Sequence, residues 1–366
     1  MPVKRQADYW IVACAMTLLV IGIVMIYSSS AVIAAERYGD PYYFLKRQAI
    51  WAVVGMASMV VAMRVDYRSL NRYSYLFYAL AVLALIAVLI PGIGHSVNGA
   101  RRWISLGFAT FQPSEFAKLA LMIFFAGLLA KKSAEGKLDD FQFGYAPNIA
   151  ALGFVFFLIQ FQPDLGTAIM ISLVIFFMFI VAGIRMSYIV VTALLASPLI
   201  LVSIFTVAYR KKRILSFLNP WEDYSDSGYQ IIQSFVALSN GGLSGAGLGA
   251  SQQKLFYLPE PHTDFIFSII SEEMGFLGAI IVLLLFMIFT WRGFRVGLKV
   301  HDKFGSLLAL GITFAISAQA IVNIAVTLGM LPTKGLPLPF ISLGGSALVM
   351  WMVSVGVLTN ISEHAA

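Results

Sequence analysis

Five ionisable side chains gather where a long polar segment meets an apolar one. They are Glu260, His262, Asp264, Glu272 and Glu273, all within residues 255–273. Ionisable groups inside a membrane-length apolar segment cost roughly 2.5–3.5 kcal/mol each by insertion scales, so they usually mark a function. A carboxylate beside an imidazole at the aqueous mouth of a membrane helix is placed as a general base would be.

Asp264 is the candidate catalytic residue, but simpler roles exist for it and its neighbours. We expect a helix from about Thr263, where Asp264 could instead cap free backbone N–H groups. On that helix Glu272 would lie about 12 Å deeper, within a quarter-turn of the same face, whereas Glu273 would face nearly opposite. The alternative role of Glu272 and Glu273 is an ion pair or hydrogen bond between helices.

A second acid–base pair lies in the segment Gln-Pro-Ser-Glu-Phe-Ala-Lys at residues 112–118. Pro113 suits the first turn of a helix. Glu115 and Lys118 are three positions apart and therefore share a face of that helix. Either the two side chains neutralise each other, or Lys118 faces a cavity and balances a carboxylate or an anionic substrate group.

Basic residues flank these acids in the expected outer loops. Arg101 and Arg102 are adjacent, residues 210–213 are all basic, and Lys334 is the single charge in the turn 331–339. Arginine forms two-pronged contacts with phosphate. Arg101, Arg102 and residues 210–213 would, together with Lys254, form a basic rim suited to a lipid-linked phosphate or diphosphate. Solvated loop charges or contacts with lipid headgroups are the alternative.

The composition requires a membrane to position these residues. Hydrophobic residues make up 60% of the chain and charged residues 12%, against about 45–50% and about 25% in ordinary globular chains. The apolar residues form ten continuous blocks of spanning length, which favours helices over a barrel. The blocks cover residues 10–33, 46–63, 73–90, 113–130, 146–161, 165–183, 187–209, 263–290, 304–328 and 338–359.

These blocks predict an all-α polytopic membrane protein that forms one integral-membrane domain over residues 1–366. About ten spans put both termini on one side, and the basic short loops on that side make it cytoplasmic. The first block is too long for a signal-peptide core and is expected to remain as a span. One long extracytoplasmic loop, at about 210–262, would precede the eighth helix.

Several other functions are excluded or weakened by what the sequence contains. The net charge of +7 reports topology and anionic headgroups rather than nucleic-acid binding. The single cysteine, Cys14, allows no internal disulfide, and the four histidines form no zinc-protease motif. The glycine-dense segment 239–249 lacks the strand and the Lys-Ser/Thr of a phosphate loop, so a turn-forming hinge is the better interpretation.

Longer motifs carry a resemblance to a known family over nearly the whole chain. The chain resembles the SEDS proteins (shape, elongation, division and sporulation), and its wording at 219–223 and 254–260 favours the division type over the elongation type. The motifs are Asn-Pro-Trp-Glu-Asp at 219–223, Lys-Leu-Phe-Tyr-Leu-Pro-Glu at 254–260, His-Thr-Asp-Phe-Ile-Phe at 262–267, Leu-Pro-Thr-Lys-Gly-Leu at 331–336 and Pro-Phe-Ile-Ser at 339–342.

The resemblance implies a peptidoglycan glycosyltransferase at the outer face of the bacterial cytoplasmic (inner) membrane, acting at the division septum. Its substrate would be lipid II, a disaccharide-pentapeptide on undecaprenyl diphosphate. The aspartate of the His-Thr-Asp motif, here Asp264, would be the essential general base of an inverting reaction. The predicted substrate-binding residues are Arg101, Arg102, Glu115, Lys118, Lys254, Glu260, His262, Glu272 and Lys334.

The resemblance also implies partners. They are a single-span transpeptidase (a class B penicillin-binding protein) and other division proteins, besides membrane lipid; no nucleic acid is expected. A divalent cation, Mg²⁺ or Mn²⁺, could share the neutralisation of the diphosphate, although the sequence fixes no metal ligands.

Three rival functions stay open at this point. A lipid II flippase would use the same charges but needs a site near the midplane that is reachable from both sides. A non-catalytic scaffold of the division complex would need no base at Asp264. An elongation-type polymerase would catalyse the same reaction elsewhere in the cell.

Overall fold

The computed structural model describes residues 6–97, 100–105, 107, 110–222, 227–255, 257–259 and 261–365. Within these residues, nine helices are long and apolar enough to cross a membrane, and α4, with 16 residues, is shorter. Each of the ten predicted apolar blocks therefore forms a helix. They are α1 (Tyr9–Tyr38), α2 (Tyr43–Arg64), α4 (Ser74–Leu89), α5 (Pro113–Ala134), α6 (Ala146–Gln160), α7 (Leu165–Ala182), α8 (Met186–Phe205), α11 (Ile266–Lys299), α12 (Lys303–Thr327) and α13 (Gly345–Ser362).

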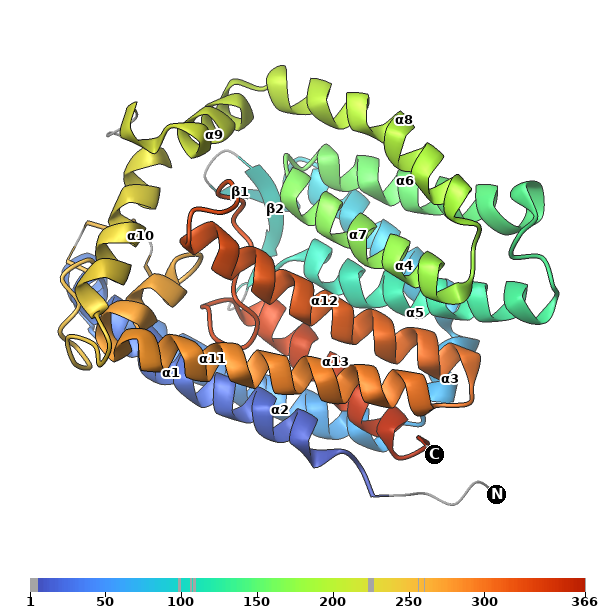
Figure 1. Cartoon of the computed structure of the whole chain (residues 1–366), viewed down its shortest axis with the longest axis horizontal. Coiled ribbons are helices and arrows are strands. Elements are labelled where there is room, and N and C mark those ends of the chain that lie inside the picture. Colours follow the sequence, from blue (N-terminus) through green and yellow to red (C-terminus); the bar gives the residue numbers. More distant parts are fainter. Residues whose placement is uncertain are drawn as a thin grey trace.

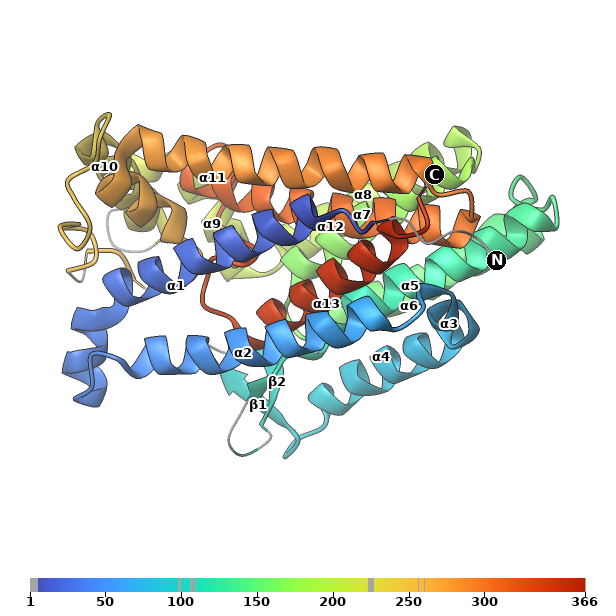
Figure 2. The same cartoon turned by 90° about the horizontal axis from the view of Figure 1, so that it is seen from below.

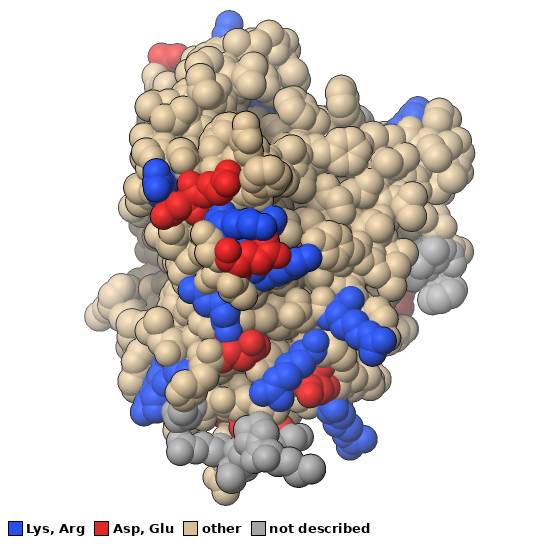
Figure 3. Space-filling view, turned by 90° about the vertical axis from the view of Figure 1, so that its right-hand side faces the viewer, with Lys and Arg blue, Asp and Glu red and all other residues tan. Residues whose placement is uncertain are grey.

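The helices form one elongated bundle with both termini at the same end (Figure 1). Lys and Arg side chains gather on that end, interleaved with Asp and Glu (Figure 3). Two examples of this pairing are Arg185 with Asp139 (3.4 Å) and Arg292 with Asp8 (2.7 Å). A basic face at the termini is what the predicted cytoplasmic orientation requires. We call the opposite end the outer end.

The helices of the bundle differ in how much of their surface is buried. Helices α5 and α12 run through its middle and are buried along most of their length. Helices α1, α2, α13 and α11 lie side by side along one flank, and α4 lies on another (Figure 2). Helix α8 runs along the edge of the bundle (Figure 1), and Ile189 is the only residue of α8 that is buried. Its remaining surface is free to face lipid.

The outer segments contain more structure than the sequence predicted. Three short antiparallel strands form one sheet in the order β1-β2-β3, and Ile104 pairs with both Gly94 and Phe111. The expected long loop at 210–262 instead begins with two amphipathic helices, in which polar and apolar residues lie on different faces. The elements are β1 (Gly94–Val97), β2 (Ala100–Ser105), β3 (Thr110–Phe111), α9 (Ala208–Leu218) and α10 (Ser227–Gly241). The remaining short helices are α3 (Tyr67–Arg72), η1 (Phe141–Tyr145) and η2 (Pro220–Glu222).

Helix α11 is interrupted at Gly275, whose φ of 66° and ψ of −165° are not helical. Such a conformation is accessible to glycine and strained for other residues. The glycine-dense segment 239–249 lies in the interruption and supplies backbone partners to the helix. The bonds are Ala246 N to Glu272 O (2.9 Å), Gly247 N to Glu273 O (3.0 Å), Phe276 N to Gly242 O (3.0 Å) and Leu277 N to Leu243 O (3.3 Å).

Candidate functional site

Asp264 lies in a turn at the outer end of the bundle, just before α11. The helix begins at Ile266 and its cap residue is Phe265, so the predicted helix start at Thr263 is wrong. Asp264 is therefore not on the helix, and the depth of Glu272 cannot be measured along one helix from it. Asp264 is partly exposed. It is not sealed among apolar side chains, and the start of α11, which it precedes, lies at the end of the bundle away from the termini (Figure 1).

The backbone around Asp264 is held by three hydrogen bonds. The carbonyls of residues 262, 263 and 264 each accept one bond from a different donor. In that order the donors are Leu343 N (3.0 Å), Ser342 Oγ (2.7 Å) and Asn323 Nδ2 (2.9 Å). The turn is thus fixed to α12 and to the segment that connects α12 to α13.

That connecting segment, residues 331–344, also lies beside the carboxylate of Asp264. Gly335 has φ of 66°, and a Cβ built on it would lie 3.5 Å from Asp264 Oδ2. Lys334 is the neighbouring residue and is partly buried, and burial lowers the pKa of its ammonium group. Lys334, one of the predicted cations, therefore directly precedes the glycine that lies beside the carboxylate.

Asn323 and Gln319 extend from the same face of α12 to this segment. Asn323 Nδ2 donates to the carbonyl of Leu336 (2.8 Å), and Gln319 Nε2 donates to that of Pro337 (2.8 Å). Two amides four positions apart on one membrane helix would usually tie it to another helix. They instead tie one helix to a non-helical segment, whose backbone groups need partners inside a bilayer protein.

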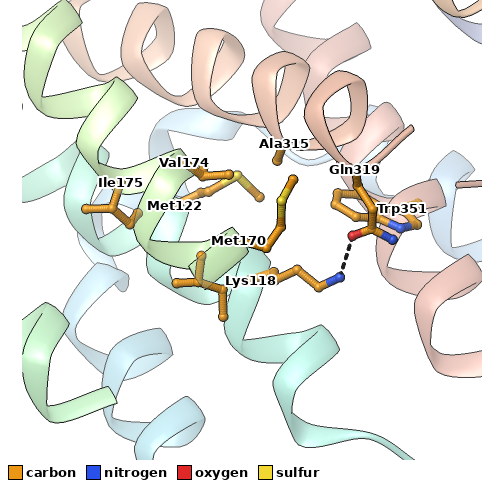
Figure 4. A pocket seen from close by; sticks show the side chains of 9 residues that line it. Lys118, Met122, Met170, Val174, Ile175, Ala315, Gln319 and Trp351 are labelled. Carbon is orange, nitrogen blue, oxygen red and sulfur yellow. Dashed lines mark hydrogen bonds between the residues drawn. The ribbon is translucent and has the colours of Figure 1, made fainter. Parts of the chain in front are cut away.

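Lys118 and Glu115 lie inside the bundle, on the inner side of this segment. Lys118 Nζ is 2.8 Å from Glu115 Oε2, in an ion pair without the geometry of a linear hydrogen bond. It also donates to Gln319 Oε1 (2.8 Å) and lies 4.9 Å from the centre of the Trp351 ring. Figure 4 shows Lys118, Gln319 and Trp351 with Met122 and Met170 around a small cavity. Mutual neutralisation is therefore observed, and Lys118 also lines a cavity.

Lys254 does not join the predicted basic rim. Its Nζ lies 2.9 Å from Glu273 Oε1 and 2.6 Å from the carbonyl of Gly249, and both charged side chains are almost fully buried. Ser28 of α1 also donates to Glu273, at 2.6 and 2.7 Å from its two carboxylate oxygens. The pairing that the sequence left open for Glu273 is thus present, with a loop lysine as the partner.

Glu272 holds the same loop. Its carboxylate accepts from Ser251 Oγ, from Gln252 N (3.1 Å) and from Gln253 N (3.4 Å). These contacts match the hydrogen-bonding alternative for Glu272 and leave its predicted substrate contact without support from the structure. Glu260, another predicted substrate-binding residue, lies outside the described residues.

Arginines do gather at the outer end, around an aspartate that sequence reasoning missed. Arg102 donates to the carbonyls of Gln162 (3.2 Å) and Pro163 (2.5 Å) and lies 3.9 Å from Asp164 Oδ1. Arg210 is close enough that, besides burial, the charge of Arg102 lowers its pKa. A lone Asp at the start of an apolar block was the available signal for Asp164.

The other basic residues of the rim differ in their exposure and contacts. Arg213 donates to the carbonyl of Thr333 (3.1 Å), which joins α9 to the connecting segment 331–344. Arg101 is exposed on β2, opposite Ser96 of β1. The basic rim therefore consists of Arg102, Arg210, Arg213 and Lys334, with Arg101 on the adjoining sheet.

His262 is buried beneath the turn and not available as a surface acid or base. Its ring lies 4.5 Å from that of Phe44, and Nδ1 has no hydrogen-bond partner in the described part of the molecule. Burial, and secondarily the charge of Arg37, lowers the pKa of His262 from 6.5 to about 4. The imidazole is therefore neutral at pH 7.

Among the described residues, no group of three or more His, Cys, Asp or Glu side chains is arranged to hold a metal ion. The side chains present do not fit a metal site built by the protein alone. The charge available at the outer end comes from Arg and Lys.

The architecture defines a class: a multi-pass helical membrane protein with a partly exposed carboxylate beside a basic rim. The chain belongs to the FtsW/RodA/SpoVE family of cell cycle proteins, the SEDS family, which it matches over residues 8–366. It is 45% identical over 360 residues to the "Probable peptidoglycan glycosyltransferase FtsW" of Geobacter sulfurreducens, covering 98% of this chain and 96% of that one. It is 43% identical over 362 residues to the "Stage V sporulation protein E" of Bacillus subtilis, covering 99% and 98%.

Solved structures show the same fold. One, described as "Structural coordination of polymerization and crosslinking by a peptidoglycan synthase complex", superposes with a TM-score of 0.79 at 27% identity and covers 97% of both chains. The rod shape determining protein RodA of Thermus thermophilus superposes with a TM-score of 0.72 at 26% identity, covering 97% of this chain and 96% of that one.

Proposed function

We propose that this protein is a peptidoglycan glycosyltransferase that polymerises lipid II at the outer face of the cytoplasmic membrane. The full-length relative named for that activity supports the reaction class. The observation that supports the site is Asp264, a partly exposed carboxylate whose turn is fixed by three hydrogen bonds at the outer end.

Asp264 acts as the general base in this proposal. It takes the proton from the attacking hydroxyl of the acceptor sugar, and the oxygen forms a bond to the anomeric carbon of the donor sugar. The bond from that carbon to the polyprenyl diphosphate breaks, and the diphosphate leaves with the electron pair. Attack from the opposite face converts an α-linked donor into a β-1,4 product, so no covalent sugar–enzyme intermediate is needed.

Cations of the rim stabilise the departing diphosphate. Arg102 and Lys334 lie at the outer end with Asp264, and Arg101, Arg210 and Arg213 extend the rim. Preformed positive charge where negative charge develops lowers the barrier without reorganisation at the moment of reaction. Lys118 contributes from the cavity below, where its charge is shared with Glu115.

The flippase alternative is less well supported by the position of the buried charges. Lys118 is five residues from the start of α5, which places it about 8 Å from the outer end of that helix. A transporter needs its site near the midplane. The charged groups of the site are therefore concentrated on one side.

The proposed setting is septal synthesis together with a class B penicillin-binding protein and other division proteins. The relatives named FtsW favour division, and the sporulation relative of similar identity shows that this branch serves more than one process. The similar synthase-complex structure supports a crosslinking partner. Depletion followed by microscopy tests the setting: filaments indicate division, and rounded cells indicate elongation.

The decisive assay uses the chain purified with its transpeptidase partner and supplied with lipid II. Glycan polymer should form with the wild type and not with Asp264→Asn. Asp139→Asn, which removes an exposed carboxylate beside Arg185 at the other end, is the matched control and should leave polymerisation unchanged. Polymer formation by Asp264→Asn at the wild-type rate would contradict the assignment. Lipid II transfer across sealed vesicles, measured in parallel, tests the flippase alternative.

A further inference from the structure

We propose that Asn323 and Ser342 are positioning residues for the glycosyl transfer. They hold the turn that carries Asp264 in register with the connecting segment 331–344. The inference rests on the proposed function, because it concerns the base of that reaction. Neither side chain is expected to touch the substrate: both are buried, with 2% and 5% of their surface exposed.

Asn323 connects the turn that carries Asp264 to the segment 331–344 through a single amide group. Its Nδ2 donates both to the carbonyl of Asp264 (2.9 Å) and to the carbonyl of Leu336 (2.8 Å). Leu336 directly follows Gly335, on which the Asp264 carboxylate packs, and Lys334 precedes that glycine. One side chain therefore fixes the backbone of the base relative to the segment that carries Lys334 and Gly335.

Ser342 provides a second connection between the same two segments. Its hydroxyl accepts from Leu338 N (2.8 Å) and donates to the carbonyl of Thr263 (2.7 Å). Removing the hydroxyl takes the acceptor from the buried N–H of Leu338 and one donor from the Thr263 carbonyl, and an unmade bond at a buried group costs more than the bond contributes when made. Among the bonds between described residues, the bond from Leu343 N to His262 O still connects the turn to this segment.

The bonds that Asn323 and Ser342 donate to the turn end on backbone carbonyls and not on the carboxylate. These bonds therefore fix the position of Asp264, and they do not contribute to the groups that surround its carboxylate oxygens. Misplacing a catalytic group by about 1 Å can reduce the rate about 100-fold. Loss of either side chain should thus lower kcat by about 10- to 100-fold while KM changes little.

The test compares four variants in the partner-activated polymerisation assay. Asn323→Leu and Ser342→Ala remove the bonds, and Ser342→Thr keeps a hydroxyl. Ser317→Ala is the matched control, because it removes a partly buried hydrogen bond between α12 and α11, the one that joins Ser317 Oγ and Thr290 Oγ1 (2.6 Å), away from the turn. We expect low kcat for the first two, recovery with Ser342→Thr, and near-normal kcat for Ser317→Ala at similar thermal stability.

A second arm does not depend on activity. In a Cys14→Ser background, Asp264→Cys introduces the single thiol of the chain, whose alkylation rate by a small water-soluble maleimide reports its position. Adding Asn323→Leu should change that rate several-fold, and adding Ser317→Ala should not. Unchanged alkylation together with unchanged kcat would overturn the inference. Altered alkylation in a protein whose Asp264→Asn variant still polymerises would instead overturn the proposed function and leave the positioning intact.

Discussion

Lys254 and Glu273 form an ion pair of 2.9 Å that is almost completely buried. Lys254 belongs to the outer loop and Glu273 to the first part of α11, the helix that starts two residues after Asp264. The pair therefore connects a loop that sequence motifs mark as characteristic of the family to the helix that follows the proposed base. Its role is to hold the loop, and its charge is not offered to substrate.

Breaking this pair on one side should destabilise the protein. Lys254→Met leaves the Glu273 carboxylate buried without its cation, which typically costs about 3–5 kcal/mol. The double variant Lys254→Met with Glu273→Gln should regain most of the loss, because no unpaired charge then remains. Thermal unfolding in detergent measures both. A single variant as stable as the wild type would show that the pair is not formed.

The Glu115–Lys118 pair allows structure and chemistry to be separated. Lys118→Met should lower stability by about 3–5 kcal/mol, because Glu115 stays buried and unpaired. Combining it with Glu115→Gln should restore the fold. If Lys118 also stabilises the leaving diphosphate, the restored double variant stays slow in polymerisation. A stable double variant with wild-type turnover would limit the pair to a structural role.

A side chain at Gly335 should impair the protein both by straining the backbone and by contacting Asp264, and a control variant separates these two effects. Gly335→Ala strains a backbone with φ of 66° by about 1–2 kcal/mol and places a methyl group against Asp264 Oδ2. Gly39 has φ of 69° with no atom within 4 Å of the position of its Cβ, so Gly39→Ala carries the strain alone. We expect polymerisation to fall at least about tenfold in Gly335→Ala and to persist in Gly39→Ala.

His262 should make the fold sensitive to acid. Because its pKa is about 4 in the folded protein against 6.5 in the unfolded chain, the unfolded state binds more protons between these values. Its contribution to stability is complete above about pH 6.5 and is lost as the pH falls towards 4, by roughly 3 kcal/mol in all. His262→Phe should show a smaller decrease in melting temperature from pH 7.5 to pH 4.5 than the wild type. Equal decreases would mean that the imidazole is not buried in neutral form.

A divalent cation, Mg²⁺ or Mn²⁺, should act only together with substrate. The described residues form no metal cluster of their own, so chelation with EDTA should not change the melting temperature of the substrate-free protein. We expect EDTA to lower polymerisation of lipid II and added Mg²⁺ or Mn²⁺ to restore it. Polymerisation that is indifferent to EDTA would remove the cation from the proposal.

Sequence alone correctly predicted the long apolar helices, because they depend on the average hydropathy of many residues. Ten apolar blocks became ten helices because a bilayer-spanning segment must satisfy its own backbone and present apolar side chains throughout. Helix α9 escaped notice because its four consecutive basic residues lower its hydropathy, and α10 because its Ser, Gln and Asn residues do the same. The break at Gly275 was not foreseen either, since glycine within a helix is common and its conformation depends on the segment that packs against it.

Side-chain partners proved harder to predict than helices. Glu115 and Lys118 met as expected because three positions on one helix fix their distance. Lys254 was assigned to the rim because nothing in the sequence places it next to Glu273, which depends on how the outer loop folds back. An amide within an apolar helix, such as Asn323, indicates a hydrogen bond, but its partner here, the backbone of Asp264, is brought to it only by the folded chain.

The interruption of α11 has a practical consequence for anyone who modifies this protein. Segment 242–247 looks like an external linker in the sequence. Its amides and carbonyls nevertheless form the backbone hydrogen bonds that α11 cannot form within itself on either side of Gly275. An epitope tag or fluorescent fusion placed between Gly242 and Gly247 would therefore break these hydrogen bonds and disrupt a transmembrane helix, although the insertion itself lies outside the membrane. Tags belong at the termini, which lie together at the far end of the molecule (Figure 1).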